Sequence, residues 1–267
     1  MAIITFMSDY GHRDHYIASV KAKILSFSHT LNIVDISHQI EPFNVAHAAY
    51  ILKSVYKDFP KGTVHLVSIN IPNNTSDRLL AMKLEEHYFV GGDNGLFSLL
   101  SDKAPTAIVE LKKDIANNNY DHAFPEKTSM ASAAALLANA GNIYNLGPQV
   151  QEIKSLLNRQ IRISKNQISG NVIHVDNYGN LVTNISRENF NEVNSNRNFI
   201  ILFSSGEEMN TISDSYNSVD TGEYVALFNS NGLLEIAIRE GNGSQLLGMY
   251  IDSPVNISFI ESHAEIA

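Results

Sequence analysis

The sequence predicts an α/β protein in two parts: a doubly wound, mostly parallel sheet domain at residues 1–155 and a small all-β, barrel-like domain at residues 156–267. In the first half, short apolar strand runs alternate with segments of helical spacing, as in βα units around a parallel sheet. After Leu146-Gly147-Pro148, only short β runs follow, separated by Gly, Asn and Ser. The 267 residues, 44% of them hydrophobic, are enough for a sizeable core.

The elements of the first half follow from apolar spacing and from turn residues. The predicted strands are Ile3–Met7, Leu31–Ile36, Thr63–Ile69, Leu79–Leu84 and His87–Val90, of which Leu31–Ile36 is expected to be buried and the last two to form a hairpin. The predicted helices are Asp14–Phe27, Asn44–Tyr56 and the Ala-rich Ser129–Ala140, with Gly141 expected as the C′ residue of the last one.

The second half predicts strands alone. These are Ile161–Ile163, Asn171–Val175, Leu181–Ile185, Phe199–Phe203, Tyr224–Phe228, Leu233–Ile238 and Val255–Ile260.

Composition excludes several classes of partner. The net charge of −9 offers no basic face for nucleic acid or for an anionic membrane surface. The chain has no cysteine, so it forms neither disulfides nor thiolate metal sites. No signal peptide and no membrane span are predicted, and a cytoplasmic protein is expected.

Four polar loops are candidates for a binding site: Ser8–Asp14, Asn70–Arg78, Asp93–Ser98 and Asp176–Asn184. Asp9 follows the first predicted strand, and ligands of such sheets bind outside the carboxyl ends of the strands. A carboxylate there suits the hydroxyls of a ribose better than a phosphate. The alternatives stay open, because Asp9 also suits a cap and Asn-rich loops also suit plain turns.

Other catalytic motifs are missing from the sequence. His12 and His15 lie close to Asp9, but no HExxH-like helical pair occurs, and no metal site is expected. No phosphate-binding glycine loop of the kinase, GTPase or dinucleotide type follows a strand, and no GxSxG elbow is present. A bound cofactor is therefore not expected.

Six motifs in order carry a family resemblance over about residues 3–260: SDYG-x-x-D-x-Y, IVDISHQIEPFNVAHAAYIL, FPKGTVHLVSIN, YFVGGDNGLFS, VDNYGNLVTNI and FNSNGLLEIAI. Together they resemble the S-adenosylmethionine (SAM) hydroxide adenosyltransferases, which are relatives of fluorinase and chlorinase. The resemblance implies an α/β domain followed by a β-barrel-like domain. It also implies a homotrimer that holds SAM between domains of neighbouring subunits, and attack of water at the ribose C5′ to give adenosine and methionine.

The resemblance also implies a set of binding residues. Asp9 matches the carboxylate that binds the ribose hydroxyls, and Phe43 matches an aromatic wall of the pocket. The remaining matches are Asp176 and Asn180 for the methionine part, Tyr178 for packing on the adenine, and Ser230, Asn231, Asn242 and Gly243 for the loops around the adenine.

Two of the three family water-site positions differ in this chain. Asn70 stands where the family has Asp, and Pro125 stands where it has His, whereas Arg78 keeps the family Arg. Glu126 replaces a serine that cradles halide in the halogenases, and a carboxylate there would repel a halide. We therefore do not expect a halogenase.

Two functional hypotheses follow. The first is a SAM hydrolase in which Asn70, Arg78 and Glu126 form the water site, with Glu126 as the base and His122 as a second candidate. The second is a SAM- or adenosine-binding protein that has lost turnover. Glu126 and His122 are equally compatible with ordinary surface residues.

Overall fold

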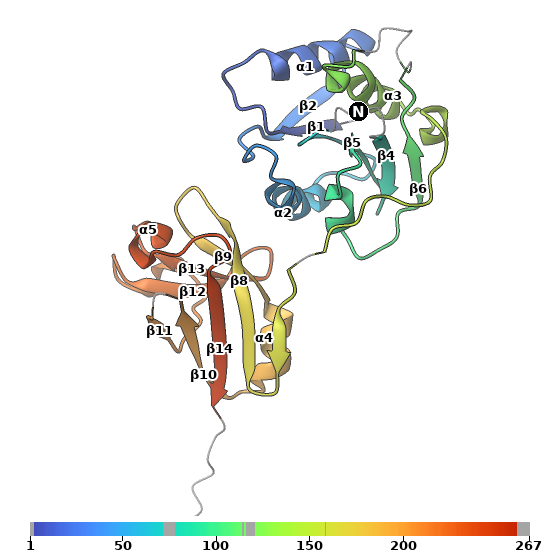
Figure 1. Ribbon diagram of the computed structural model, residues 1–267. Coiled ribbons are helices and arrows are strands. Elements are labelled where there is room, and N and C mark those ends of the chain that lie inside the picture. The colour runs from blue at the N-terminus through green and yellow to red at the C-terminus, as the bar shows by residue number, and fades with distance from the viewer. Residues whose placement is uncertain are drawn as a thin grey trace, which may run out of the picture. The chain divides into compact units, whose positions relative to one another are not determined.

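The computed structural model describes residues 3–71, 78–113, 115, 121–157, 159–204 and 206–260. The chain divides into two units, Met1–Leu157 and Asn158–Ala267 (Figure 1). The division lies two residues beyond the expected boundary between residues 155 and 156.

The first unit is built on a six-stranded sheet with the order β2-β1-β3-β5-β4-β6. Its strands are β1 (Ile3–Ser8), β2 (Asn32–Ser37), β3 (Val64–Ser68), β4 (Leu79–Leu84), β5 (His87–Gly92) and β6 (Ala107–Glu110). The pairs β2–β1, β1–β3 and β3–β5 are parallel, and β4 runs antiparallel to both of its neighbours. This is the mostly parallel sheet that the sequence predicted, including the β4–β5 hairpin.

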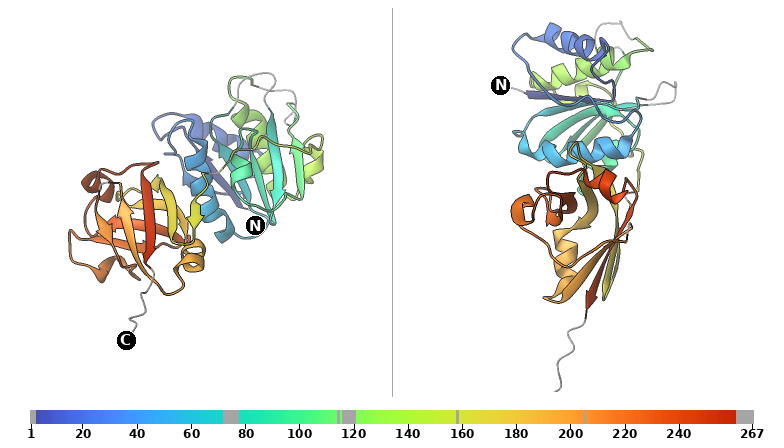
Figure 2. Two further views of the ribbon diagram at one scale, coloured as in Figure 1. Left: turned by 60° about the horizontal axis from the view of Figure 1, so that its bottom comes forward. Right: turned by 90° about the vertical axis from the view of Figure 1, so that its left-hand side faces the viewer.

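Helices cover both faces of this sheet, as in a doubly wound fold. The helices are α1 (Tyr16–Phe27), α2 (Val45–Val55) and α3 (Ala131–Ala138), with short turns η1 (Tyr56–Asp58), η2 (Leu96–Leu99), η3 (Glu126–Met130) and η4 (Ile143–Asn145). Figure 2 shows α1 and α3 on one face and α2 on the other. Two separate apolar cores result, one between the sheet and α1 and α3, the other between the sheet and α2.

The chain leaves β1 through α1 to reach β2 on one side of it, and leaves β2 through α2 to reach β3 on the other side. The carboxyl ends of β1 and β3 therefore form a topological switch point, the place where ligands bind in open α/β sheets. Asp9 and Asn70 lie in the loops that follow these two strands.

Two details of the first unit differ from the sequence prediction. The prediction that Leu31–Ile36 is a buried strand is wrong, because β2 is the edge strand and none of its residues is fully buried. The predicted C′ residue is also wrong: Ala140 has the left-handed φ of 62°, and the Gly141 N–H donates to Leu136 O at 2.9 Å. This is a Schellman motif displaced by one residue, with Ala in the position that favours Gly.

The second unit is an antiparallel sheet that curves into a nearly closed barrel, as predicted. Its strands are β7 (Arg162–Ser164), β8 (Gln167–Val175), β9 (Leu181–Ser186), β10 (Asn198–Phe203), β11 (Glu208–Met209), β12 (Tyr224–Phe228), β13 (Leu233–Ile238) and β14 (Pro254–Ile260). It also contains α4 (Arg187–Asn194), α5 (Gly243–Leu247) and η5 (Tyr216–Ser218), which the sequence analysis did not predict. The helix α4 has only Phe190 and Val193 as buried positions, too few for a clear helical pattern.

None of the helices in the described part of the chain is both long and apolar enough to cross a bilayer.

The left-handed Ala140 gives a stability prediction. Ala140→Gly should raise the free energy of unfolding by about 1 kcal/mol, because a Cβ in this conformation is unfavourable and Gly has none. Ala138→Gly, inside α3, is the matched control and should lower it by a similar amount. Thermal or urea unfolding measures both variants, and equal effects of the two substitutions would contradict the prediction.

Candidate functional site

The carboxylate of Asp9 joins the loops at the switch point. Its Oδ2 accepts the backbone N–H of Phe43 at 3.0 Å and that of Asn70 at 3.2 Å. Phe43 and Asn70 both have left-handed backbones, with φ of 65° and 43°. Such conformations are costly for residues other than Gly, and a charged acceptor stabilises them. Asp9 therefore fixes the segments that follow β2 and β3 around one oxygen.

Phe43 presents its ring to solvent. The side chain is 73% exposed, although the N–H of the same residue is bound by Asp9. A bulky residue with positive φ and an exposed ring indicates a functional constraint. This position suits the wall of a ligand pocket, the role that the resemblance implies.

Glu126 is a buried carboxylate beside the same two strand ends. Its Oε1 accepts a hydrogen bond from the Tyr10 hydroxyl at 2.8 Å and lies 3.4 Å from the Ser68 hydroxyl oxygen. The hydroxyl oxygens of Tyr10 and Ser68 are 2.6 Å apart. Tyr10 follows β1 and Ser68 ends β3, so Glu126 reaches across the switch point. The residue opens η3, a π-helical turn, which is a frequent feature of functional sites.

The environment of Glu126 makes the carboxylate more basic. Burial raises the pKa of Glu126 above its ordinary value, and the charge of Asp9 acts in the same direction, while the bonds from Tyr10 and Ser68 oppose it. Burial, and then the charge of Glu126, raise the pKa of Tyr10, which therefore stays protonated as the donor. Sequence reasoning missed Tyr10 and Ser68, although Tyr10 stands directly beside Asp9 in the first motif.

Arg78 is paired with Asp93. Its Nη2 and Nε lie 2.5 Å and 3.1 Å from Asp93 Oδ2, and Asp93 is nearly completely buried. Nη2 also donates to the carbonyl of Glu152 at 3.0 Å, and Asp93 Oδ1 accepts the Lys154 N–H at 2.8 Å. The charge of Arg78 is thus matched by Asp93, and the pair ties residues 152–154 to the end of β5.

The remaining water-site candidates lie in different surroundings. Asn70 is exposed at the end of β3, and Asn94 Nδ2 donates to the carbonyl of Ile69 at 2.7 Å. Pro125 directly precedes Glu126 and is the N-cap residue of the π-helical turn. His122 is an exposed residue in the segment before that turn. Of the predicted catalytic residues, the structure therefore brings Asn70 to Asp9 and Glu126 to the neighbouring Tyr10, while the Arg78 guanidinium contacts Asp93 and Glu152.

In the second unit, Asp176 organises a turn that carries two predicted ligand contacts. Its Oδ1 accepts the N–H groups of Tyr178 and Asn180 at 2.9 Å and 2.8 Å, and its Oδ2 accepts Asn180 Nδ2 at 3.0 Å. Asn180 is almost buried, whereas the Tyr178 ring is 75% exposed. The turn therefore holds a carboxylate and an amide together and leaves an aromatic ring outside.

This turn packs closely on the loop before α5. The Ser244 N–H donates to the carbonyl of Gly179 at 2.8 Å, and Asn242 caps α5 by accepting the Gln245 N–H at 2.9 Å. A Cβ on Gly179 would lie 2.3 Å from Asn242 Cγ, and one on Gly243 would lie 3.1 Å from the Gly179 carbonyl. The loops that carry Asp176, Tyr178, Asn180, Asn242 and Gly243 are thus brought together, and their role in binding a ligand stays a prediction.

Ser230 and Asn231 form a separate exposed turn between β12 and β13. The turn is held by Asn229, whose Oδ1 accepts the Asn231 N–H at 3.0 Å and whose Nδ2 donates to the buried Glu235 at 3.0 Å. Glu235 also accepts the Tyr216 hydroxyl at 2.6 Å. Asn229 and Glu235 were not predicted, and they hold the turn at its base.

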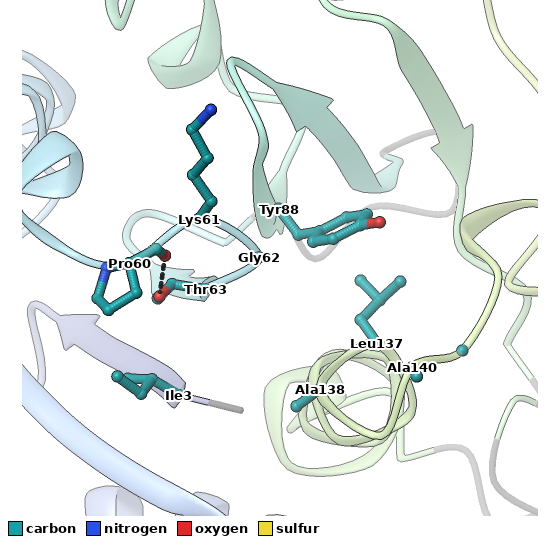
Figure 3. Close-up of a pocket in the computed structure, with 10 residues that line it drawn as sticks. Ile3, Pro60, Lys61, Gly62, Thr63, Tyr88, Leu137, Ala138 and Ala140 are labelled. Carbon is teal, nitrogen blue, oxygen red and sulfur yellow. Dashed lines mark hydrogen bonds between the residues drawn. The ribbon is translucent and has the colours of Figure 1, made fainter. Parts of the chain in front are cut away.

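A pocket of about 460 Å³ opens at the amino ends of β1 and β3, opposite to the switch point (Figure 3). It is lined by Ile3 at the start of β1, by Lys61, Gly62 and Thr63 before β3, and by the end of α3. None of the predicted site residues lines it. Within the described ranges, no three His, Asp or Glu side chains gather as a metal ion would require.

The close packing at Gly179 gives a prediction with a matched control. Gly179 and Gly222 have the same φ of 87°, but a Cβ on Gly222 meets nothing within 4 Å. Gly222→Ala should cost about 1–2 kcal/mol from the backbone alone, whereas Gly179→Ala should cost about 1–3 kcal/mol more because Asn242 must move. Unfolding of both variants measures the difference, and equal losses would show that the two loops do not pack as described.

Comparison with known proteins identifies the family of this chain. A family model described as the SAM hydroxide adenosyltransferase N-terminal domain matches residues 4–147, and the C-terminal domain model of that family matches residues 170–256. A protein from Methanocaldococcus jannaschii named (R)-S-adenosyl-L-methionine hydrolase is 29% identical over 259 residues, which cover 94% of each chain.

Two further relatives differ in what their names say. A protein from Actinopolyspora mzabensis named fluorinase is 26% identical over 216 residues, covering 70% of this chain and 72% of that one. The crystal structure of an uncharacterized conserved protein from Thermotoga maritima has a TM-score of 0.89 and 29% identity, covering 96% of this chain and 99% of that one. With more than half of its residues matched by one family model, this chain belongs to the SAM hydroxide adenosyltransferase family, as its ordered motifs predicted.

Proposed function

We propose that this protein hydrolyses S-adenosylmethionine to adenosine and methionine, with Glu126 in place of the family water-site residues. The observation that carries the proposal is the pair of carboxylates at the switch point: Asp9 at the loop junction and the buried Glu126 next to it. Family membership and a relative named SAM hydrolase support the substrate. The reaction needs no cofactor.

Asp9 would bind the ribose. Both N–H groups held by Asp9 use Oδ2, so the described contacts leave Oδ1 to accept a ribose hydroxyl. Asp176 and Asn180 would bind the methionine part, with Asp176 facing the ammonium group in a charge-assisted contact. The resemblance assigns Phe43 to a wall of the pocket, Tyr178 to packing on the adenine, and Ser230, Asn231, Asn242 and Gly243 to the loops around the adenine, with SAM held between neighbouring subunits.

Glu126 would act as the general base. Its contacts with the Tyr10 and Ser68 hydroxyls both use Oε1, and Oε2 would accept the proton from water. The water oxygen forms a bond to C5′ while the C5′–S bond breaks, and the electron pair of that bond goes to sulfur and neutralises the sulfonium. The water proton goes to Glu126. A sulfonium is a good leaving group, so the alignment of water with C5′ would supply much of the rate.

The same carboxylate disfavours halide as the nucleophile. Glu126 is only 8% exposed, so its charge is weakly screened by water and would repel a bound anion strongly. The fluorinase activity named for one relative is therefore not proposed for this chain.

A second candidate function is that of a SAM- or adenosine-binding protein without turnover. Asn70 and Pro125 have no ionisable group, and the charge of Arg78 is matched by Asp93. These observations argue against the water activation that the resemblance implies, and they do not affect the candidate binding residues Asp9, Asp176 and Asn180. We also propose a homotrimer and a cytoplasmic location, which the sequence analysis expects for either function.

Turnover and its pH dependence separate the two functions. The hydrolase should release adenosine and methionine at a rate that rises with pH, because only the ionised Glu126 accepts a proton. The pKa of Glu126 is raised above the ordinary Glu value of about 4.3. As the pH is lowered, the rate should therefore begin to fall at a pH above that value. Chromatography of the products at a series of pH values measures this.

Glu126→Gln should lower the rate by roughly 10²–10⁴-fold, the usual contribution of a general base, and should abolish this pH limb. Glu192→Gln, an exposed carboxylate in the second unit, is the control and should change neither. Heat of SAM binding without products from the unaltered protein would favour the binding protein. An unchanged rate in Glu126→Gln would remove Glu126 from the mechanism.

Asp9→Asn should weaken SAM binding by roughly 10–100-fold, the value of hydrogen bonds to a charged group. Asp58→Asn, an exposed carboxylate in η1, should bind SAM like the unaltered protein. Calorimetry gives both dissociation constants. Equal affinities of the two variants would show that Asp9 does not bind the ligand.

A further inference from the structure

We infer that His38 is a positioning residue for the ribose-binding carboxylate Asp9: it clamps the turn at residues 8–11 and so aims Asp9 at the ribose hydroxyls. The inference rests on the proposed function. His38 belongs to none of the predicted site residues, and its side chain does not touch Asp9 in the described contacts. It acts through the residues on either side of Asp9.

His38 binds this turn at two points. Its Nδ1 is 2.7 Å from the hydroxyl of Ser8, the residue before Asp9. Its backbone carbonyl accepts the N–H of Gly11 at 2.8 Å. Ser8 Oγ in turn lies 3.5 Å from the N–H of Tyr10, the residue after Asp9. The turn that carries Asp9 is therefore held on both sides by a single residue.

The two residues of the clamp, His38 and Ser8, are buried and lie beside a register shift between β1 and β2. His38 and Ser8 are both almost completely buried, and the His38 ring packs edge-on against Phe6 with 4.7 Å between centroids. The β1–β2 pairing shifts between Phe6, opposite Asp35, and Met7, opposite Ser37. Such irregularities are frequent next to functional sites, where they change the direction of a side chain.

A charged partner sets the tautomer of His38. Its Nε2 is 3.2 Å from Asp35 Oδ1, and Lys21 Nζ is 2.6 Å from Asp35 Oδ2. The nearby carboxylate favours the tautomer with the proton on Nε2, although this N–H lacks the geometry of a hydrogen bond to Asp35, and Nδ1 then accepts a hydrogen bond from the Ser8 hydroxyl. Burial lowers the pKa of His38; Asp35 acts in the opposite direction, and the charges of Lys21 and His12 act in the same direction as burial. The ring is therefore neutral at pH 7. Ser8 Oγ is then free to accept the Tyr10 N–H.

Three substitutions separate the parts of the clamp. In His38→Asn, the amide oxygen replaces Nδ1, because both atoms are bonded to Cγ, so the bond to Ser8 is kept. In His38→Gln, the terminal atoms lie one bond farther out, toward Asp35, so the bond to Ser8 is lost. Ser8→Ala removes the same bond from the other side with a smaller change in volume.

The readout is the preference for adenosine over 2′,3′-dideoxyadenosine, which lacks the hydroxyls that Asp9 would bind. Calorimetry should give the unaltered protein a preference of roughly 10–100-fold. His38→Gln and Ser8→Ala should reduce this preference by about tenfold and leave dideoxyadenosine binding unchanged, whereas His38→Asn should keep it. Asp9→Asn should abolish it.

A purely structural role for His38 would weaken both nucleosides by the same factor, and that result would overturn the inference. So would a preference near one in an unaltered protein that binds SAM, a result that leaves the proposed function standing. An unaltered protein that binds neither SAM nor a nucleoside would overturn the proposed function and the ribose role together. In that case, hydrogen exchange at Tyr10 and Gly11 in His38→Gln still measures the clamp, and unchanged protection would overturn it as well.

Discussion

The carboxylate of Asp9 is the contact on which the switch point depends. One of its oxygens accepts two backbone N–H groups from segments far apart in the chain, those of Phe43 and Asn70. Phe43 and Asn70 both have a left-handed backbone conformation, which costs about 1–3 kcal/mol for each non-Gly residue that adopts it. A charged acceptor shared by both offsets part of this cost. The same side chain thus holds two loops of the first unit together and lies at the switch point, where a ligand would bind.

The two carboxylates at this edge suit a cationic substrate. Asp9 and Glu126 add negative charge to a chain whose net charge is already −9, and both lie beside the ends of β1 and β3. The sulfonium of SAM would be attracted to this field, and an anion would be repelled. Burial raises the pKa of Glu126, and in the proposed hydrolase this stronger base would take the place of the residues that Asn70 and Pro125 replace.

The two units hold their candidate residues in different ways. In the second unit the turns that carry candidate residues are closed by neighbours in sequence: Asp176 accepts hydrogen bonds from Tyr178 and Asn180, and Asn242 caps its own helix. In the first unit the contacts join residues 30 to 116 positions apart, as in Ser8–His38 and Tyr10–Glu126. Local Asx turns are visible in a sequence, because their partners lie two to four residues away.

The sequence by itself determined most of the strands, the three helices of the first unit, the change to an antiparallel barrel-like sheet, and the family, but not β6, β11, α4 or α5. Apolar periodicity and turn residues are local properties, and six ordered motifs predict the family and, by resemblance, the candidate binding residues Asp9, Asp176 and Asn180. Only the tertiary structure decided that β2 is an edge strand, that Ala140 takes the left-handed position, that Arg78 pairs with Asp93, and that Glu126 is buried against Tyr10 and Ser68. Each of these depends on which distant segments meet, because burial and charge pairing arise only when the sheet brings strand ends together.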